Sequence, residues 1–274
     1  MKILVTGATG FLGGALVPLL VEAGHEVRVI ARGGAPQAQA LGCEVVQGDL
    51  RDADAVRGAL TGREALYHLA GRVSRDGRDA RLMYELHVDG TRSLLAEAAR
   101  QGLSRVVLAS SSGTIGVSRE RRVATEEDDY PIETVGRWPY YLSKIYEEKQ
   151  AFLAALTRGN VGERHLLGAV NWDFTEFFAR LGRIARQPPP PLRLPSAVKV
   201  AAAHLLEKLA RARGREPDLP ASDVEMGEHW FFIDSSKAER VLGFRPRDPG
   251  ETLTDTVRYV REKFLPAARR EEVG

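Results

Sequence analysis

Two side chains that can handle a proton lie four residues apart near the middle of the chain. Tyr140 and Lys144 fall in residues 138–156, whose apolar spacing predicts a helix, so the two share one face. A lysine ammonium near a tyrosine is expected to lower the pKa of its phenol, which could then act as acid or base toward a carbonyl or hydroxyl. A Tyr–Lys pair at this spacing is common by chance, so it indicates a catalytic site only together with other motifs.

A run of three serines, Ser110-Ser111-Ser112, ends the apolar stretch 104–110, which predicts a strand. Ligands bind at the carboxyl edge of parallel sheets, where this run would lie. One of its hydroxyls could therefore hydrogen-bond a substrate oxygen while a proton is transferred.

A glycine-rich loop follows a short apolar strand at residues 2–6 and precedes a predicted helix that ends near Gly24. Gly7 allows a tight turn, Gly10 lets the backbone approach a pyrophosphate at the helix N-terminus, and Gly13 lets helix and strand pack closely. An ordinary glycine-rich turn is the alternative. The strand before the loop, and the helix and second strand after it, make a dinucleotide site the prediction.

The end of the second predicted strand, residues 25–31, favours NADP over NAD. An acidic residue there would bind a ribose 2′-hydroxyl, but the chain continues with Arg32, whose guanidinium matches a 2′-phosphate. NAD stays open, because Arg32 could also be an ordinary solvated arginine. Asp49 and Leu50 could hold the adenine edge, or Asp49 could cap the helix that begins near Asp52.

The order of the predicted elements gives the fold class. Strands alternate with helices, which predicts an α/β, Rossmann-type doubly wound parallel sheet with a smaller, mostly helical C-terminal lobe. The expected domains are residues 1–157 for the dinucleotide and 158–274 for a reduced substrate lobe. The predicted strands are 2–6, 25–31, 43–49, 64–70, 104–110 and a short one at 163–167; the predicted helices are 52–60, 78–100, 138–156, 173–186, 197–213, 237–242 and 252–264. Four prolines at 188–191 predict a stiff linker, and 211–223 predicts a mobile loop.

Composition excludes several classes of protein. The 274 residues carry a net charge of +2, which gives no basis for nucleic-acid or membrane-surface binding. Cys43 is the single cysteine, so no internal disulfide and no cysteine metal cluster can form, and we predict no metal site. The chain shows neither a membrane-length apolar run nor a signal peptide. These features predict a cytoplasmic protein that acts on a small-molecule substrate.

Five motifs together resemble the extended short-chain dehydrogenase/reductase family, and within it the dihydroflavonol 4-reductase-like branch of the NAD-dependent epimerases/dehydratases. They are TGATGFLG at 6–13, YHLAG at 67–71, HVDGT at 87–91, VVLASSSGT at 106–114 and PYYLSK at 139–144. The resemblance is strong over residues 1–156 and returns at 162–178 and 232–247. It implies that Ser111, Tyr140 and Lys144 are catalytic, and it implies a homodimer. The expected cofactor contacts are Gly7, Thr9, Gly10, Phe11, Leu12, Gly13, Arg32, Asp49, Leu50, Ala70, Tyr140 and Lys144.

Two departures from the family pattern bear on activity. His87 stands where the family usually has an asparagine, and could be a polar anchor or, as we favour, a structural helix residue. The stretch after residue 156 is the second departure, since it leads directly into 163–167 where the family has a further strand and a wall of the nicotinamide site. This loss would leave an unpaired strand edge, while the adenine half of the site stays intact.

Three functions are therefore open. The leading one is an NADP-dependent oxidoreductase that transfers hydride between nicotinamide and a carbonyl or secondary alcohol. The others are a nucleotide-sugar epimerase or dehydratase, and a cofactor-binding protein with little or no catalysis. Five aromatic residues could line a substrate pocket, although a core position is the more common role for such residues. They are Trp138, Trp172, Phe174, Phe177 and Phe178.

Overall fold

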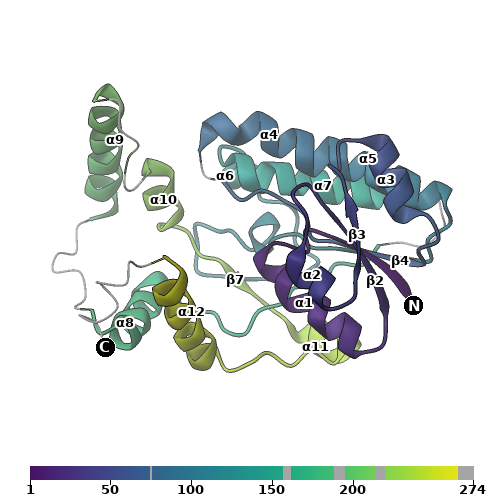
Figure 1. Ribbon diagram of the computed structural model, residues 1–274. Helices are drawn as coiled ribbons and strands as arrows, with labels where there is room; N and C mark the ends of the chain where they lie inside the picture. The colour runs from purple at the N-terminus through teal and green to yellow at the C-terminus, as the bar shows by residue number, and fades with distance from the viewer. Residues whose placement is uncertain (75, 157–161, 188–194, 214–216, 218–219, 265–274) are drawn as a thin grey trace. The chain divides into compact units, whose positions relative to one another are not determined.

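The computed structural model describes the chain except residues 75, 157–161, 188–194, 214–216, 218–219 and 265–274. Two compact units are present, drawn in Figure 1. Unit 1 comprises Met1–Thr114 and Val135–Glu163, and unit 2 comprises Ile115–Thr134 and Arg164–Gly274. Residues 115–134, which the predicted division placed with the dinucleotide domain, thus belong to unit 2.

Unit 1 is built on a five-stranded parallel sheet with the strand order β3-β2-β1-β4-β5. The strands are β1 (Lys2–Thr6), β2 (Glu26–Ala31), β3 (Glu44–Gln47), β4 (Ala65–His68) and β5 (Arg105–Leu108). The chain moves outward from β1 to β3 and then returns to place β4 on the other side of β1. This reversal creates a switch point at the carboxyl ends of β1 and β4, where such sheets bind ligands. The predicted Rossmann-type fold class is confirmed.

Helices cover both faces of this sheet (Figure 1). On one face, α1 (Phe11–Glu22) and α2 (Pro36–Ala40) bury apolar residues such as Val17 against β1 and β2. On the other face, α3 (Ala53–Leu60) and α5 (Thr91–Arg100) enclose a second core that includes Leu4, Leu60 and Leu94. These three leucines are completely buried, and truncating any of them to alanine should cost about 2–5 kcal/mol.

The helix predicted at 78–100 is present as an unbroken run of helical residues from 77 to 100, but the type of helix changes along it. It consists of a 3₁₀ turn (Gly77–Asp79), α4 (Ala80–Tyr84), a π-helical segment (Glu85–Gly90) and α5. The helix predicted at 138–156 is present as α7 (Pro139–Leu156), which packs beside α5 and the π-helical segment. π-Helical segments occur often at functional sites because the extra residue per turn redirects side chains.

Unit 2 is mostly helical. Its helices are α8 (Phe174–Ala185), α9 (Ser196–Ala212), α10 (Ala221–Met226), α11 (Ser236–Leu242) and α12 (Pro249–Phe264), and α6 (Ile132–Val135) lies at the boundary with unit 1. Two short strands, β6 (Val123–Ala124) and β7 (Phe232–Ile233), pair in parallel, which explains why 115–134 joins this unit. The sequence analysis did not predict β6, β7, α6 and α10, because elements of two to six residues are too short to show a periodic pattern.

The strand predicted at 163–167 is not formed. Its backbone is instead held by side chains, since Leu166 donates its N–H to Glu126 at 2.8 Å and Gly168 donates to Ser235 at 2.8 Å. The proline linker predicted at 188–191 lies outside the described residues, as does part of the loop predicted at 211–223. None of the helices that the structure describes has the length and apolarity of a membrane span.

Candidate functional site

The loop after β1 is too tight for a side chain at two positions. Gly7 has φ +72°, a left-handed conformation, and a Cβ there would lie 2.6 Å from the backbone nitrogen of Ala70. A Cβ at Gly13 would lie 2.6 Å from the Cα of Ala8 and closer still to the Gly7 carbonyl oxygen. Gly7 therefore lets the loop pass against the end of β4, and Gly13 lets α1 begin directly on the loop.

The N-terminus of α1 is open toward solvent. Gly10 caps the helix without a side-chain hydrogen bond, and its N–H donates to the Gly7 carbonyl at 3.0 Å. The first turn contains no acidic residue, and Thr9, Phe11 and Leu12 are all exposed. Backbone N–H groups at the positive end of a helix dipole attract anions. Because the glycines leave room where Cβ atoms would stand, the loop fits the pyrophosphate of a dinucleotide.

Arg32 lies at a hollow of about 500 Å³ beside the glycine loop. The hollow is lined by Thr9, Ala31, Arg32, Gly33 and Gly34. The Arg32 side chain is exposed, and in the part of the chain that the structure describes no acidic side chain pairs with its guanidinium. A cation at the edge of a hollow next to a phosphate-binding loop suits a second phosphate group.

Asp49 follows β3, and its carboxylate is already engaged. Arg51 donates to it from Nε at 2.9 Å and from a terminal nitrogen at 2.7 Å, and these hydrogen bonds lower the pKa of Asp49 to about 2. Asp52, and not Asp49, caps α3, because its carboxylate accepts the N–H of Asp54 at 2.9 Å. Leu50 is buried in the core beneath α3. Contacts of Asp49 and Leu50 with an adenine remain a prediction.

Tyr140 lies in the first turn of α7 beside the serine run that follows β5. The Ser111 hydroxyl hydrogen-bonds with its phenol and also accepts the N–H of Gly113 at 3.2 Å. Burial raises the pKa of Tyr140, and the hydrogen bond from Ser111 opposes this only in part. The expectation that Lys144 lowers this pKa is therefore wrong, because desolvation of the phenolate dominates.

Lys144 is buried one turn after Tyr140. Its Nζ donates to the Ala109 carbonyl at 2.8 Å, just after β5, and forms an ion pair with Glu147. The structure thus brings together the three predicted catalytic residues at the carboxyl end of β5. It also shows that the charge of the lysine is balanced by a carboxylate on its own helix.

Four buried polar side chains connect β1 with α7. Thr6 Oγ1 lies 2.7 Å from His68 Nδ1, and His68 Nε2 lies 2.8 Å from Thr91 Oγ1. Thr91 in turn donates its hydroxyl to Glu147 at 3.1 Å. All four are at most 1% exposed. Since buried polar groups are costly unless they are bonded, this chain of hydrogen bonds specifies how β1, β4, α5 and α7 meet.

His87 is buried in the π-helical segment and both of its ring nitrogens are bonded. The backbone N–H of Arg72 donates to Nε2 at 2.9 Å, and Nδ1 lies 2.8 Å from Ser143 Oγ. Ser143 donates its own hydrogen to the Tyr140 carbonyl at 2.8 Å, so Nδ1 of His87 must be the donor to Ser143. His87 is therefore a polar anchor between the loop after β4 and the start of α7, which is the alternative that the sequence analysis did not favour.

The two buried histidines make stability depend on pH. Burial lowers the pKa of His68 to about 3 and that of His87 to about 4. Because both values lie below the unfolded value near 6.5, their contribution to stability is present above that pH and is lost as the pH falls toward 4. Each histidine adds a slope of at most ~1.4 kcal/mol per pH unit to the free energy of unfolding. Urea unfolding between pH 7.5 and 4.5 measures the slope.

Burial raises the pKa of Glu147, so this carboxyl changes the free energy of unfolding with pH in the direction opposite to the histidines. The contribution of His87 is therefore measured by comparing a variant with the wild type. His87→Gln should have a smaller slope than the wild type between pH 6.5 and 4.5. Equal slopes in His87→Gln and the wild type would show that His87 is not buried in its neutral form.

Sequence reasoning missed several residues that hold the catalytic groups. Glu147 follows Lys144 by three positions and Tyr140 by seven, so helical spacing alone places it on their face. Its neighbour Glu148 accepts hydrogen bonds from Ser110 and, at 2.8 Å, from Thr114. The spacing was a usable signal for Glu147, whereas the partners of Glu148 depend on tertiary structure.

The sequence model of the NAD dependent epimerase/dehydratase family matches residues 3–159, more than half of the chain. The chain belongs to the NAD dependent epimerase/dehydratase family. The predicted resemblance is thereby confirmed at the level of the family, and a nicotinamide dinucleotide is the cofactor that the family description names.

Curated relatives and a solved structure cover nearly the whole chain. The chain is similar to sterol demethylase protein B of Methylococcus capsulatus, with 30% identity over 328 residues, 97% of this chain and 100% of the relative. It is also similar to a putative dihydroflavonol 4-reductase of Synechocystis sp., with 27% identity over 320 residues and 93% of each chain. The crystal structure of gox2253 has a TM-score of 0.78 and 26% identity, covering 96% of this chain and 98% of that chain.

The alignment with the first of these relatives is longer than the 274 residues of this chain, so the relative has positions that this family member lacks. The sheet of unit 1 ends at β5, where Val106 is 41% and Val107 is 40% exposed. Within the described residues no further strand pairs with β5, as expected from the shortened middle. Most of the connecting stretch 157–162 lies outside the described residues.

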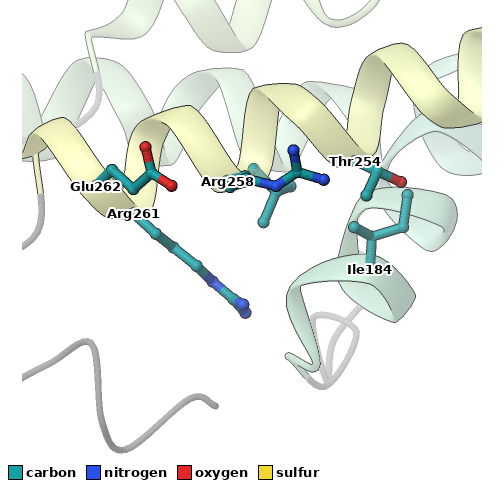
Figure 2. Close-up of a pocket in the computed structure, with 6 residues that line it drawn as sticks. Ile184, Thr254, Arg258, Arg261 and Glu262 are labelled. Carbon is teal, nitrogen blue, oxygen red and sulfur yellow. The ribbon is translucent and has the colours of Figure 1, made fainter.

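Unit 2 contains a separate hollow of about 330 Å³, lined by α8 and α12 (Figure 2). Ile184 of α8 faces Thr254 and two arginines of α12 in this hollow. Arg261 donates to the Ala185 carbonyl at 3.0 Å, and Arg258 pairs with Asp255 at 3.2 Å. Both arginines therefore have partners within unit 2.

Aromatic residues of α8 are not core residues. Phe174 is 40% and Phe178 is 53% exposed, and their rings stack with centroids 6.2 Å apart. The guanidinium carbon of Arg180 lies 4.5 Å from the ring centroid of Trp172. Trp138 is buried, with 2% of its surface exposed. The core interpretation is correct for Trp138 and wrong for Phe174 and Phe178, which present an apolar surface in unit 2.

Proposed function

We propose that this family member is an NADP(H)-dependent reductase that converts a carbonyl into a secondary alcohol, with Tyr140 as the proton donor. The observation that carries the proposal is the meeting of Ser111, Tyr140 and Lys144 at the carboxyl end of β5. A raised pKa keeps the phenol of Tyr140 protonated at ordinary pH, which suits a donor. Turnover of a panel of aldehydes and ketones with NADPH tests the proposal.

The residues divide the work of the reaction. A nicotinamide dinucleotide, when bound, would supply the hydride for the carbonyl carbon. Tyr140 gives its hydroxyl proton to the carbonyl oxygen, so the product is a neutral alcohol. Ser111 hydrogen-bonds the same oxygen as negative charge develops on it. Lys144 would hold the ribose of the cofactor with the one ammonium proton that Ala109 and Glu147 do not take.

Preference for NADP over NAD depends on Arg32 in this proposal. Arg32→Gln is expected to weaken NADPH binding by about tenfold to a hundredfold, because a hydrogen bond between charged groups contributes ~1.5–3 kcal/mol. NADH affinity should stay within about threefold, since NADH lacks the 2′-phosphate. Fluorescence titration of both cofactors measures the two dissociation constants.

Arg57→Gln is the matched control for this substitution. Arg57 is also exposed, but it pairs with Asp54 on α3, away from the glycine loop. Loss of its charge should leave both affinities unchanged. Equal affinities for NADPH and NADH in the wild type would overturn the assignment of Arg32 and leave NAD as the cofactor.

A binding protein with little catalysis is the second candidate, and the exposed edge of β5 favours it. In the proposed site the nicotinamide would be held near this edge, where the family resemblance implies a further strand. Tight NADPH binding without turnover would support this candidate. An epimerase or dehydratase, the other function that the family description names, would return the hydride to its own product.

Location and assembly belong to the proposal as well. We infer a reducing, cytoplasmic compartment from the single Cys43, which cannot form an internal disulfide. A homodimer is supported by exposed apolar residues on α4 and α7, Tyr84, Tyr146 and Leu153.

A further inference from the structure

Glu147 lies one turn beyond Lys144 on α7, and its side chain is completely buried. We infer that Glu147 is a positioning residue which fixes Lys144 Nζ beside the end of β5 and cancels the charge that the lysine would otherwise exert on Tyr140. This inference rests on the proposed function, which assigns the proton transfer to Tyr140.

The two oxygens of Glu147 have separate partners. Oε2 forms the ion pair with Lys144 Nζ, and Oε1 accepts the Thr91 hydroxyl at 3.1 Å. Lys144 Nζ also donates to the Ala109 carbonyl at 2.8 Å. An unpaired ion at such depth would cost several kcal/mol, so the lysine and the carboxylate each require the other. The position of Nζ is therefore fixed from two sides, by the end of β5 and by Glu147.

Hydrogen-bond directions show that the network ends on a carboxylate. Thr91 gives its one hydroxyl proton to Glu147, so it must accept from His68 Nε2. His68 then carries its proton on Nε2, and its Nδ1 accepts the hydroxyl proton of Thr6 at 2.7 Å. The Thr6 oxygen accepts two backbone N–H groups, from Leu69 and Ala70, both at 3.2 Å. Every donor in this chain thus points toward Glu147, which is the terminal acceptor.

The charges near Glu147 are few. On α7 it has the Lys144 cation, the Glu148 carboxylate and the Tyr140 phenol, and from β4 and the π-helical segment come His68 and His87. Both histidines are neutral at ordinary pH, since burial lowers the pKa of each. Burial raises the pKa of Glu147, while the Lys144 ammonium and the Thr91 hydroxyl oppose that rise. Lys144 and Glu147 therefore form a pair of opposite charges with no other buried cation close by among the described residues.

This pairing explains the behaviour of Tyr140. The charge of Glu147 acts with burial to raise the pKa of the phenol, and Lys144 does not lower it. A tyrosine that keeps its proton can donate it to a carbonyl oxygen but is a poor base toward an alcohol. Removing the carboxylate charge of Glu147 while keeping its shape should leave the positive charge of Lys144 uncompensated. That charge should then lower the pKa of Tyr140.

Titration of Tyr140 in the cofactor-free protein tests the inference. With ¹³Cζ-labelled tyrosine, NMR follows the seven tyrosines, and Tyr140→Phe assigns the resonance of Tyr140. In Glu147→Gln, its titration should move to lower pH by about one unit, the change that ~1.4 kcal/mol of charge interaction produces. Glu147→Asp keeps the charge and should titrate closer to the wild type than Glu147→Gln does.

Thr91→Val separates charge from structure. It breaks the hydrogen bond to Oε1 but keeps the ion pair, so it should destabilise the fold without moving the titration of Tyr140. An unchanged titration in Glu147→Gln, or the same shift in Thr91→Val, would overturn the inference. If Glu147→Gln does not fold, Lys144→Met serves instead, because it leaves the carboxylate uncompensated and should move the titration of Tyr140 to higher pH.

Activity provides an independent reading. In Glu147→Gln the alkaline loss of carbonyl reduction, which follows deprotonation of Tyr140, should begin about one pH unit lower than in the wild type. An enzyme that shows the titration shift but no turnover in either direction would contradict the proposed function and leave the role of Glu147 intact.

Discussion

Replacing Tyr140 by phenylalanine is expected to lower kcat for carbonyl reduction by about 10²–10⁴-fold, the usual contribution of general acid catalysis. The substitution removes the proton that the proposed mechanism transfers to the substrate oxygen. Ser111 would still hydrogen-bond that oxygen, and Lys144 would still hold the cofactor. NADPH affinity should therefore change little, and fluorescence titration beside steady-state kinetics measures both quantities.

Tyr141→Phe is the matched control for this result. Tyr141 is the next residue of α7, and its ring packs against Gly113, where a Cβ would collide with it. The phenylalanine ring keeps this packing, so kcat should stay near the wild-type value. A variant pair in which Tyr141→Phe is inactive and Tyr140→Phe is active would reverse the assignment of the proton donor.

Gly13→Ala is expected to abolish NADPH binding and to destabilise unit 1. The added methyl would lie 2.6 Å from the Ala8 Cα, which is backbone and cannot move aside without shifting the glycine loop. Overpacking of this kind costs about 1–3 kcal/mol, and a displaced loop no longer presents its N–H groups to the pyrophosphate. Thermal unfolding and NADPH titration of the same sample check both effects.

Gly14→Ala provides the control one residue away. The nearest atom to a Cβ at Gly14 is the Gln37 Oε1 at 4.0 Å, an ordinary contact. Alanine also favours the helix by about 1 kcal/mol over glycine, so this variant should bind NADPH normally and unfold at a slightly higher temperature. Normal NADPH binding by Gly13→Ala would contradict the placement of the pyrophosphate at this loop.

The dinucleotide half of the fold was predictable because its signals are local. The apolar run before Gly7, the glycine spacing and the following helix each lie within about a dozen residues, and together they specify β1, the loop and α1. The five strands of unit 1 were found for the same reason. The exposed edge of β5 was expected from the shortened middle, not from periodicity.

The network around the catalytic residues could not be predicted in this way. His68, Thr91 and Glu147 are separated in sequence by 23 and 56 residues, and only the tertiary fold joins them. The raised pKa of Tyr140 depends on burial and on the charge balance at Lys144, neither of which spacing reveals. The π-helical segment that contains His87 could not be predicted either, because a change of helix type does not alter the amphipathic pattern enough to be recognised.

Hydride transfer from deuterated NADPH tests the central claim most directly. The wild-type protein is incubated with the panel of aldehydes and ketones and with NADPH that carries deuterium at both C4 positions. Mass spectrometry then measures the deuterium content of the alcohol products. The proposed reductase predicts alcohols that contain one deuterium, in amounts that fall sharply in Tyr140→Phe. Tight NADPH binding with no deuterium in any product would contradict a reductase and favour a protein that binds the cofactor without using it.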